Sequence, residues 1–159
     1  MYSSDLITPI GRLLIKGNQT NIYSINFSDE VINTPSSSLT EQAKQQLQDY
    51  FHLTRCHFTF PMLQVGTSFQ QAVWKQLSKI EIDKPISYAT LAKRMNNPLA
   101  IRAIAAANGK NKLTIIVPCH RVIGSSGDLV GYAGGLWRKK WLLEHEIKLS
   151  GIGQSTLTF

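Results

Sequence analysis

Hydrophobic and polar positions in the first sixty residues follow a strand-like spacing and then a helical one. Leu6–Lys16 and Asn21–Phe27 are short runs rich in β-branched residues, and Gly17-Asn18 between them is typical of a hairpin turn. Five apolar positions then recur at helical spacing and predict a helix that ends near residue 52: Leu39, Ala43, Leu47, Tyr50 and Phe51.

Short polar motifs mark the ends of these elements. Ser38-Leu39-Thr40-Glu41 has the form of a capping box, with Ser38 as the N-cap and Glu41 at position N3. His57–Phe60 alternates polar and aromatic residues like a short strand, and Pro61 ends it. Together these elements predict an N-terminal α+β domain over residues 1–64.

The composition changes after residues 61–66, which we interpret as a linker, and the pattern becomes mainly helical. We therefore expect a second, mostly helical domain over residues 65–159. Ser68 is placed to cap its first helix. One apolar stripe follows at helical spacing: Phe69, Val73, Leu77 and Ile80.

Two more helices have clear start signals. Ser87 can cap a helix that runs from Tyr88 to about Met95, after Pro85 has broken the chain. Gly134-Gly135 precedes a last helix, which we expect over about residues 136–148.

A further helix follows the one that begins at Tyr88 and forms a pair with it. Asn97 is its expected N-cap, Pro98 takes the first helical position, and Leu99–Asn108 is followed by Gly109 as the C′ residue. Two short helices joined by a three-residue turn have the form of a helix-turn-helix, although many helical hairpins share this shape.

Positive charge is concentrated in the second part of the chain. Residues 1–60 carry four Lys or Arg and five Asp or Glu, a net of −1, whereas residues 61–159 carry thirteen and five, a net of +8. A basic part beside a near-neutral part suggests that only the second part meets a polyanion, with general solubility charge as the alternative.

The second helix of the pair strengthens the case for DNA. Arg102 stands there among small residues, and Ala103, Ala105 and Ala106 would let the backbone approach a groove wall closely while the arginine projects into it. The alternative is a tightly packed core helix. We expect the DNA interface to include these residues together with two asparagines that follow, Asn108 and Asn111.

Bulk features narrow the class of protein. The chain has 159 residues, 43% of them hydrophobic, and no apolar run approaches the roughly 20 residues of a membrane span. The first residues lack the features of a secretory signal, so we expect Cys56 and Cys119 to be reduced thiols in the cytoplasm, or in the nucleus of a eukaryote.

One short segment carries candidate chemistry. The apolar run Ile115–Val117 ends at Pro118, and Cys119, His120 and Arg121 follow directly. We expect a strand that stops at Pro118 and presents Cys119 at an open sheet end. Nearby cations or helical N–H groups would favour the thiolate, which is the nucleophilic form. The alternative is a small buried hydrophobe, a common role for free cysteine.

Pro118-Cys119-His120-Arg121-Val122 resembles the active-site signature of the O6-alkylguanine-DNA alkyltransferases. The resemblance extends over most of residues 68–146, and the first sixty residues match only loosely, through Thr8-Pro9-Ile10-Gly11. The flanking matches, in order, are these: Ile86-Ser87-Tyr88, Arg102-Ala103, Ala107-Asn108-Gly109, Asn111, Gly131-Tyr132-Ala133-Gly134-Gly135 and Trp141-Leu142-Leu143-Glu144-His145-Glu146.

The resemblance implies a DNA repair protein that acts once, on double-stranded DNA containing O6-alkylguanine. The damaged guanine is flipped out of the duplex, and the Cys119 thiolate takes its alkyl group irreversibly. His120 would act as base toward Cys119 through a water, and Glu146 would orient the imidazole. Tyr88 would donate a proton to guanine N3. O4-methylthymine is a possible second substrate.

The same resemblance implies further contacts. Arg102 would fill the space of the flipped nucleotide, and Asn111 would tie the turn before the active-site segment. Backbone carbonyls of Cys119 and Val122 would read the guanine amino group, the Ala133 N–H would approach O6, and Tyr132 would line the alkyl pocket. It also implies a ribonuclease-H-like fold for the N-terminal domain, followed by a winged or helix-turn-helix-like domain.

Three positions depart from the family pattern. Ala133 stands where serine is frequent, Lys112 where proline is common, and Ala105 where glycine is frequent. Some family members hold zinc, but His52, Cys56 and His57 do not make a convincing ligand set. We expect no metal, no cofactor, no membrane contact and a monomer.

Three other functions stay open at this point. A non-catalytic sensor of alkylated DNA would resemble this chain with the reactive cysteine replaced. A Cys-His hydrolase of another kind would turn over repeatedly and ignore DNA. A helix-turn-helix regulator would bind a specific sequence and would be unaffected by thiol-blocking reagents.

Overall fold

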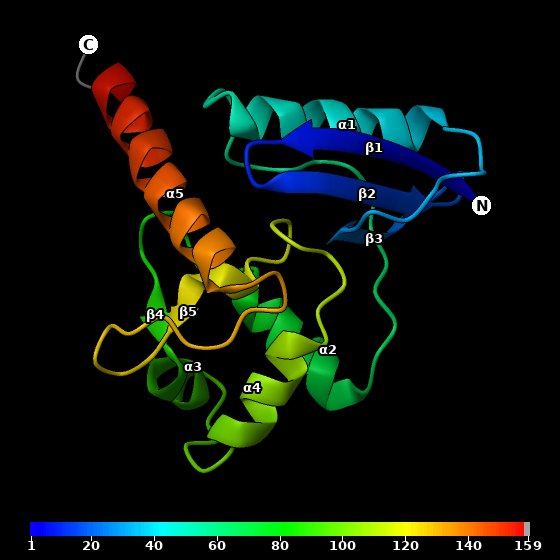
Figure 1. The fold of residues 1–159 in the computed structure, drawn as a ribbon. Helices are drawn as coiled ribbons and strands as arrows, with labels where there is room; N and C mark the ends of the chain where they lie inside the picture. The colour runs from blue at the N-terminus through cyan, green and yellow to red at the C-terminus, as the bar shows by residue number, and fades with distance from the viewer. Residues whose placement is uncertain (158–159) are drawn as a thin grey trace. The chain divides into compact units, whose positions relative to one another are not determined.

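The computed structural model describes residues 1–157 of the chain and divides them into two units (Figure 1). The N-terminal unit comprises residues 1–64, residues 112–114 and the end of the chain from Ile152. The C-terminal unit comprises residues 65–111 and 115–151. The mixed α+β class expected from the sequence is confirmed, and the division into folding domains at residue 64 stays a prediction.

The N-terminal unit is a three-stranded antiparallel sheet with a helix along one face (Figure 1). Its strands, in spatial order, are β1 (Tyr2–Thr8), β2 (Gly11–Gly17) and β3 (Ile22–Phe27), and its helix is α1 (Ser38–Phe51). Strand β2 pairs antiparallel with β1 on one side and with β3 on the other, and the helix packs on β1 and β2. The turn predicted at Gly17-Asn18 is confirmed.

One predicted strand is really a hairpin. The run Leu6–Lys16 contains both the end of β1 and most of β2, because the chain reverses at Pro9-Ile10 and pairs Thr8 with Gly11. Gly11 has φ 122°, a conformation that favours glycine and that allows so tight a reversal.

The strand predicted at His57–Phe60 was wrong. Pairing begins two residues after Phe60, where Met62 forms a parallel bridge with Ile22 in β3. The Thr59 N–H instead donates to the side chain of Gln46 on α1, at 2.9 Å. A second parallel bridge joins Leu113 to Ile25, so residues 112–114 lie beside β3 within the N-terminal unit.

The N-cap of α1 lies one residue before the predicted one. Ser37, not Ser38, caps α1 in an extended conformation, and Thr40 rather than Glu41 closes the capping box. The Ser37 hydroxyl accepts from the Thr40 N–H at 3.0 Å, and the Ser37 N–H donates to the Thr40 hydroxyl at 2.8 Å. In a run of three serines, sequence pattern alone does not fix which one adopts the extended backbone.

The C-terminal unit is mainly helical, with a two-stranded parallel ribbon (Figure 1). Thr67 caps its first helix in place of the predicted Ser68, because the Thr67 hydroxyl accepts from the Gln70 N–H. The elements of the unit are α2 (Ser68–Leu77), β4 (Ile86–Ser87), α3 (Tyr88–Arg94), α4 (Ile101–Gly109), the short 3₁₀ helix η1 (Cys119–Arg121), β5 (Val122–Ile123) and α5 (Leu136–Leu157).

The helix-turn-helix pair, α3 and α4, is present with a longer turn than predicted. Ser87 caps α3 as expected. Helix α4 begins at Ile101 rather than Leu99, because the Asn97 N–H bonds back to Ala92 and the Ala100 N–H bonds to Asn97. Residues 97–100 therefore form an extra turn, and Leu99 within it is 96% exposed.

Other boundaries of this unit also differ from the predictions. Gly109 is the last helical residue of α4 rather than its C′ residue, and Lys110 is the C-cap. No strand forms over Ile115–Val117, since Ile115 has φ 75° and the chain turns there. Helix α5 continues past the predicted end at Lys148, to Leu157.

Each unit buries its own apolar side chains. Fully buried residues of the C-terminal unit come from several elements: Leu77, Leu91, Ile104, Val122 and Leu142. Among the described residues, no helix combines the length and apolar character needed to cross a membrane.

Replacing Ser37 with alanine tests the cap assignment. Ser37→Ala removes the acceptor for the Thr40 N–H and should lower the free energy of unfolding by about 1 kcal/mol. Ser38→Ala is the matched control and should leave it nearly unchanged. Urea denaturation of the three proteins measures the difference; equal losses from both variants would contradict the assignment.

Candidate active site

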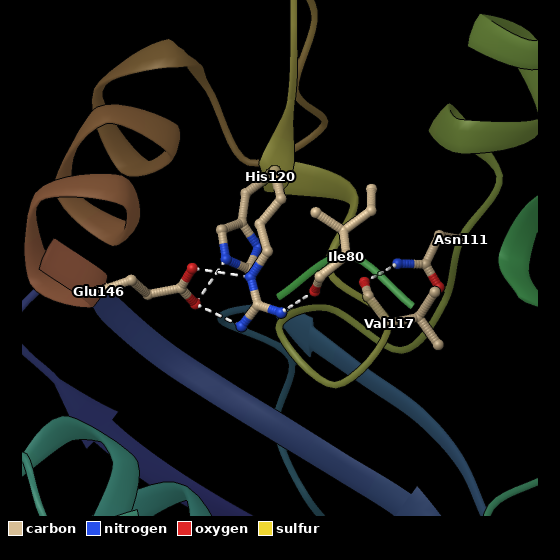
Figure 2. Close-up of polar contacts among 6 residues, drawn as sticks. Ile80, Asn111, Val117, His120 and Glu146 are labelled. Atoms are coloured by element: carbon tan, nitrogen blue, oxygen red, sulfur yellow. Dashed lines mark hydrogen bonds and ion pairs between the residues drawn. The ribbon is translucent and has the colours of Figure 1, made fainter. Parts of the chain in front are cut away.

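The centre of the candidate site is the carboxylate of Glu146, which α5 holds fully buried (Figure 2). Its Oε1 accepts from Nε of Arg121 at 2.8 Å, and its Oε2 accepts from Nη2 of Arg121 at 2.9 Å. The same Oε2 lies 2.8 Å from Nε2 of His120. One carboxylate therefore joins both residues that follow Cys119.

Arg121 is anchored at a second point. Its Nη1 donates to the backbone carbonyl of Ile80, just beyond α2, at 2.6 Å (Figure 2). The guanidinium thus connects α5 to the end of α2 from inside the unit. Sequence reasoning missed this role, since the partner carbonyl lies forty-one residues away and leaves no side-chain signal.

Electrostatics fixes the protonation of Glu146. Burial alone would raise the pKa of its carboxyl, but His120 and the hydrogen-bonded Arg121 together hold that pKa well below its usual range. An ionised carboxylate only accepts hydrogen bonds, so Nε2 of His120 carries the proton between them. Nδ1 of His120 is buried and has no hydrogen-bond partner among the described residues.

The position of Cys119 differs from the predicted open sheet end. Cys119 opens η1 and is only 8% exposed, and its N–H donates to the Val117 carbonyl at 2.8 Å. Burial raises the pKa of the thiol, while a hydrogen bond from Asn111 and the charge of Lys139 oppose that rise. The resting thiol is therefore less acidic than the sequence suggested, and a base is needed to ionise it.

Lys139 is a charged group that the sequence did not single out. Its side chain is fully buried, and its Nζ donates to the carbonyls of Val130 at 2.7 Å and Gly131 at 3.3 Å. Burial lowers the pKa of Lys139 to about 8, and the nearby Cys119 opposes the shift. Nothing in the sequence distinguishes it from its exposed neighbour Lys140.

Tyr88 and two asparagines lie near Cys119. Nδ2 of Asn108 lies 3.1 Å from the Tyr88 hydroxyl and 3.5 Å from the Cys119 carbonyl. Nδ2 of Asn111 donates to the Val117 carbonyl at 2.9 Å, as Figure 2 shows. Burial raises the pKa of Tyr88, and the Asn108 hydrogen bond partly offsets this. Asn108 is only 6% exposed, so it does not share the solvent-facing position expected of a DNA contact.

The remaining predicted site residues fall into two groups. The first group lies on α4: Arg102, Ala103 and Ala106 are exposed to solvent and Ala105 is half-buried. The other group is less uniform: Val122 is buried in β5, Ala133 is exposed, and Tyr132 is half-buried with a buried hydroxyl that has no partner among the described residues. Burial raises the pKa of Tyr132.

Within the described part of the chain, no three His, Cys, Asp or Glu side chains gather closely enough to hold a metal ion. The absence of a metal or cofactor in the functional protein stays a prediction.

A helix-turn-helix pair in one unit with a buried cysteine and a hydrogen-bonded histidine and glutamate defines a class: a DNA-binding type of scaffold that carries a candidate cysteine site. Residues 68–148 match the family model described as the 6-O-methylguanine DNA methyltransferase DNA binding domain, and residues 1–64 match that of the ribonuclease-like domain. The chain belongs to the 6-O-methylguanine DNA methyltransferase family.

Individual relatives agree with this assignment. The methylated-DNA–protein-cysteine methyltransferase of Methanosarcina acetivorans is 38% identical over 153 residues, which cover 92% of this chain and 98% of the relative. The constitutive Bacillus subtilis protein of that name is 41% identical over 143 residues, covering 84% and 87%. The crystal structure of Mycobacterium tuberculosis OGT in complex with DNA has a TM-score of 0.86 at 38% identity and covers 94% of both chains.

Lys139 provides a test of the electrostatics around the thiol. Lys139→Met removes the nearby positive charge, so the pKa of Cys119 should rise and alkylation by iodoacetamide near neutral pH should slow by about threefold to tenfold. Lys140→Met, one residue along and exposed, is the control and should react like the parent. Equal rates in all three proteins would show that Lys139 does not act on the thiol.

Proposed function

We propose that this protein repairs O6-alkylguanine in DNA by moving the alkyl group irreversibly to its own Cys119. The observation that carries the proposal is the buried hydrogen bond between His120 and Glu146, directly beside a cysteine in a member of this family. The DNA complex of the M. tuberculosis relative supports DNA as the partner. Alkylguanine specificity and action as a monomer in the cytoplasm are further parts of the proposal.

The first step is ionisation of the nucleophile. Because burial disfavours the thiolate of Cys119, the proton needs an acceptor close by. His120 offers the lone pair of Nδ1, since its Nε2 proton is held by Glu146. Side chains adjacent in sequence rarely meet directly, so the proton passes through a water to the imidazole.

The transfer itself is a substitution at carbon. The sulfur of Cys119 bonds to the alkyl carbon while the bond from that carbon to guanine O6 breaks, and the electron pair stays on the base. Tyr88 gives a proton to guanine N3 as this charge develops. The product is a thioether, and no group in the site restores the thiol, so each molecule reacts once.

Base recognition rests on backbone and small side chains. The carbonyls of Cys119 and Val122 accept from the guanine amino group, and the N–H of Ala133 approaches O6. Tyr132 lines the space for the alkyl group. O4-methylthymine fits the same chemistry, since its alkyl carbon is bonded to an equivalent oxygen.

DNA is engaged through the exposed side of α4. Arg102 enters the stack and fills the space of the extruded nucleotide, and the small residues Ala103 and Ala106 allow close approach. Charge supports this assignment, because residues 84–127 contain seven Lys or Arg and no Asp or Glu. Asn111 acts from inside by fixing the turn that leads to η1.

A non-catalytic sensor of alkylated DNA is the rival function. The intact thiol of Cys119, next to a histidine whose Nε2 is held by Glu146, favours transfer over sensing.

Mass spectrometry tests the transfer. Incubation with duplex DNA containing O6-methylguanine should add one methyl group per protein, located on the Cys119 peptide. Cys119→Ala should abolish transfer and keep DNA binding. Cys56→Ala is the matched control, since Cys56 is the other free cysteine, and it should transfer normally. Many lesions repaired per molecule, or methylation elsewhere, would exclude the proposed reaction.

Arg102 tests the DNA step separately from the chemistry. Arg102→Ala should slow methyl transfer from duplex DNA by at least about tenfold, because the unstacked position is no longer filled. Its reaction with the free base O6-methylguanine should equal that of the parent, because no duplex has to be opened. Equal slowing with both substrates would assign Arg102 to the chemistry or the fold instead.

A further inference from the structure

We propose that Asn108 is a positioning residue that holds the Tyr88 hydroxyl as a proton donor toward the substrate, anchored on the backbone carbonyl of Cys119. The inference rests on the proposed function and adds a residue to it. Its basis is a single buried amide that reaches both the proposed acid and the residue that carries the nucleophile.

Geometry decides which way the hydrogen bond to Tyr88 runs. A backbone carbonyl only accepts, so the Asn108 atom that lies 3.5 Å from the Cys119 oxygen is the NH₂ group rather than the amide oxygen. The same nitrogen lies 3.1 Å from the Tyr88 hydroxyl. One N–H therefore points to each oxygen, and the phenol oxygen acts as an acceptor.

This polarity frees the phenol proton. Because Tyr88 accepts from Asn108 on this side, its own O–H is directed elsewhere and stays available for donation. The opposite arrangement, with the hydroxyl donating to an amide oxygen, would occupy the proton that the proposed reaction needs.

The rest of the amide argues against a purely structural role. Asn108 is 6% exposed, and its Oδ1 is buried without a hydrogen-bond partner among the described residues. An apolar side chain of similar volume would avoid that unsatisfied oxygen. The benefit of an asparagine here lies in the two bonds from its nitrogen.

The hydrogen bond that Asn108 donates also stabilises Tyr88 while Tyr88 transfers its proton to guanine. As the O–H bond of Tyr88 breaks and an N–H bond forms on guanine, negative charge is left on the phenolate oxygen. The Asn108 N–H already points at that oxygen and stabilises the charge, consistent with its effect of lowering the pKa of Tyr88 against burial. After guanine has left, the proton that His120 took from the Cys119 thiol passes through water to the Tyr88 phenolate, so the net proton transfer is from sulfur to guanine.

A double-mutant cycle tests the proposal through single-turnover rates on duplex DNA with O6-methylguanine. Asn108→Leu should slow transfer by about tenfold, the loss expected for one hydrogen bond to a developing charge. Tyr88→Phe should slow it at least as much. In the Tyr88→Phe protein, Asn108→Leu should have little further effect, since the hydroxyl that it serves is gone.

Two further measurements separate positioning from folding. Alkylation of Cys119 by iodoacetamide should be the same in Asn108→Leu as in the parent, and tyrosinate absorbance should show a higher pKa for Tyr88. If Asn108→Leu does not fold, Asn108→Asp decides, because it keeps the shape but turns the donor into an acceptor and should slow transfer at least as much.

These measurements distinguish failure of the role proposed for Asn108 from failure of the proposed alkyl transfer. A parent protein that transfers no methyl group overturns the function itself. If the parent transfers normally, two results on the variants would overturn only the role of Asn108. One is that the Asn108 variants react at the parent rate. The other is that Asn108→Leu and Tyr88→Phe reduce the rate independently.

Discussion

The site depends on one buried negative charge. Glu146 lies where an unpaired carboxylate would be very costly, and it is stable there because Arg121 and His120 share its two oxygens. Arg121 and His120 both donate to the carboxylate, so the Nε2–H of His120 is directed at Glu146. The Nδ1 atom of the ring then has no hydrogen-bond partner among the described residues and is the base in the proposed reaction.

The same network explains why the segment after Pro118 keeps its shape without a strand to hold it. Arg121 is tied at one end to α5 through Glu146 and at the other to the Ile80 carbonyl beyond α2. Asn111 and Asn108 hold the backbone at Val117 and Cys119. Cys119 is therefore placed by polar contacts to four residues, Glu146, Ile80, Asn111 and Asn108, whereas a sheet edge would have placed it by backbone pairing alone.

The sequence predicted the parts of the structure that depend on local pattern. Helical spacing predicted α1 and α2, cap and turn residues predicted α3, α4 and α5, and the adjacent residues Cys119 and His120 marked the candidate site. It missed what depends on distant backbone or on burial. Its strand before Pro118 does not form, because the chain turns at Ile115 with φ 75°, which an apolar run does not reveal. It assigned no role to Arg121 or Lys139, because their partner carbonyls and their burial depend on the folded structure.

The central claim concerns which nitrogen of one ring donates to Glu146, and nitrogen-15 NMR of histidine-labelled protein measures it directly. At a pH where the ring of His120 is neutral, before reaction, its proton should lie on Nε2 and Nδ1 should be unprotonated. A neutral ring that carries its proton on Nδ1 would contradict the account.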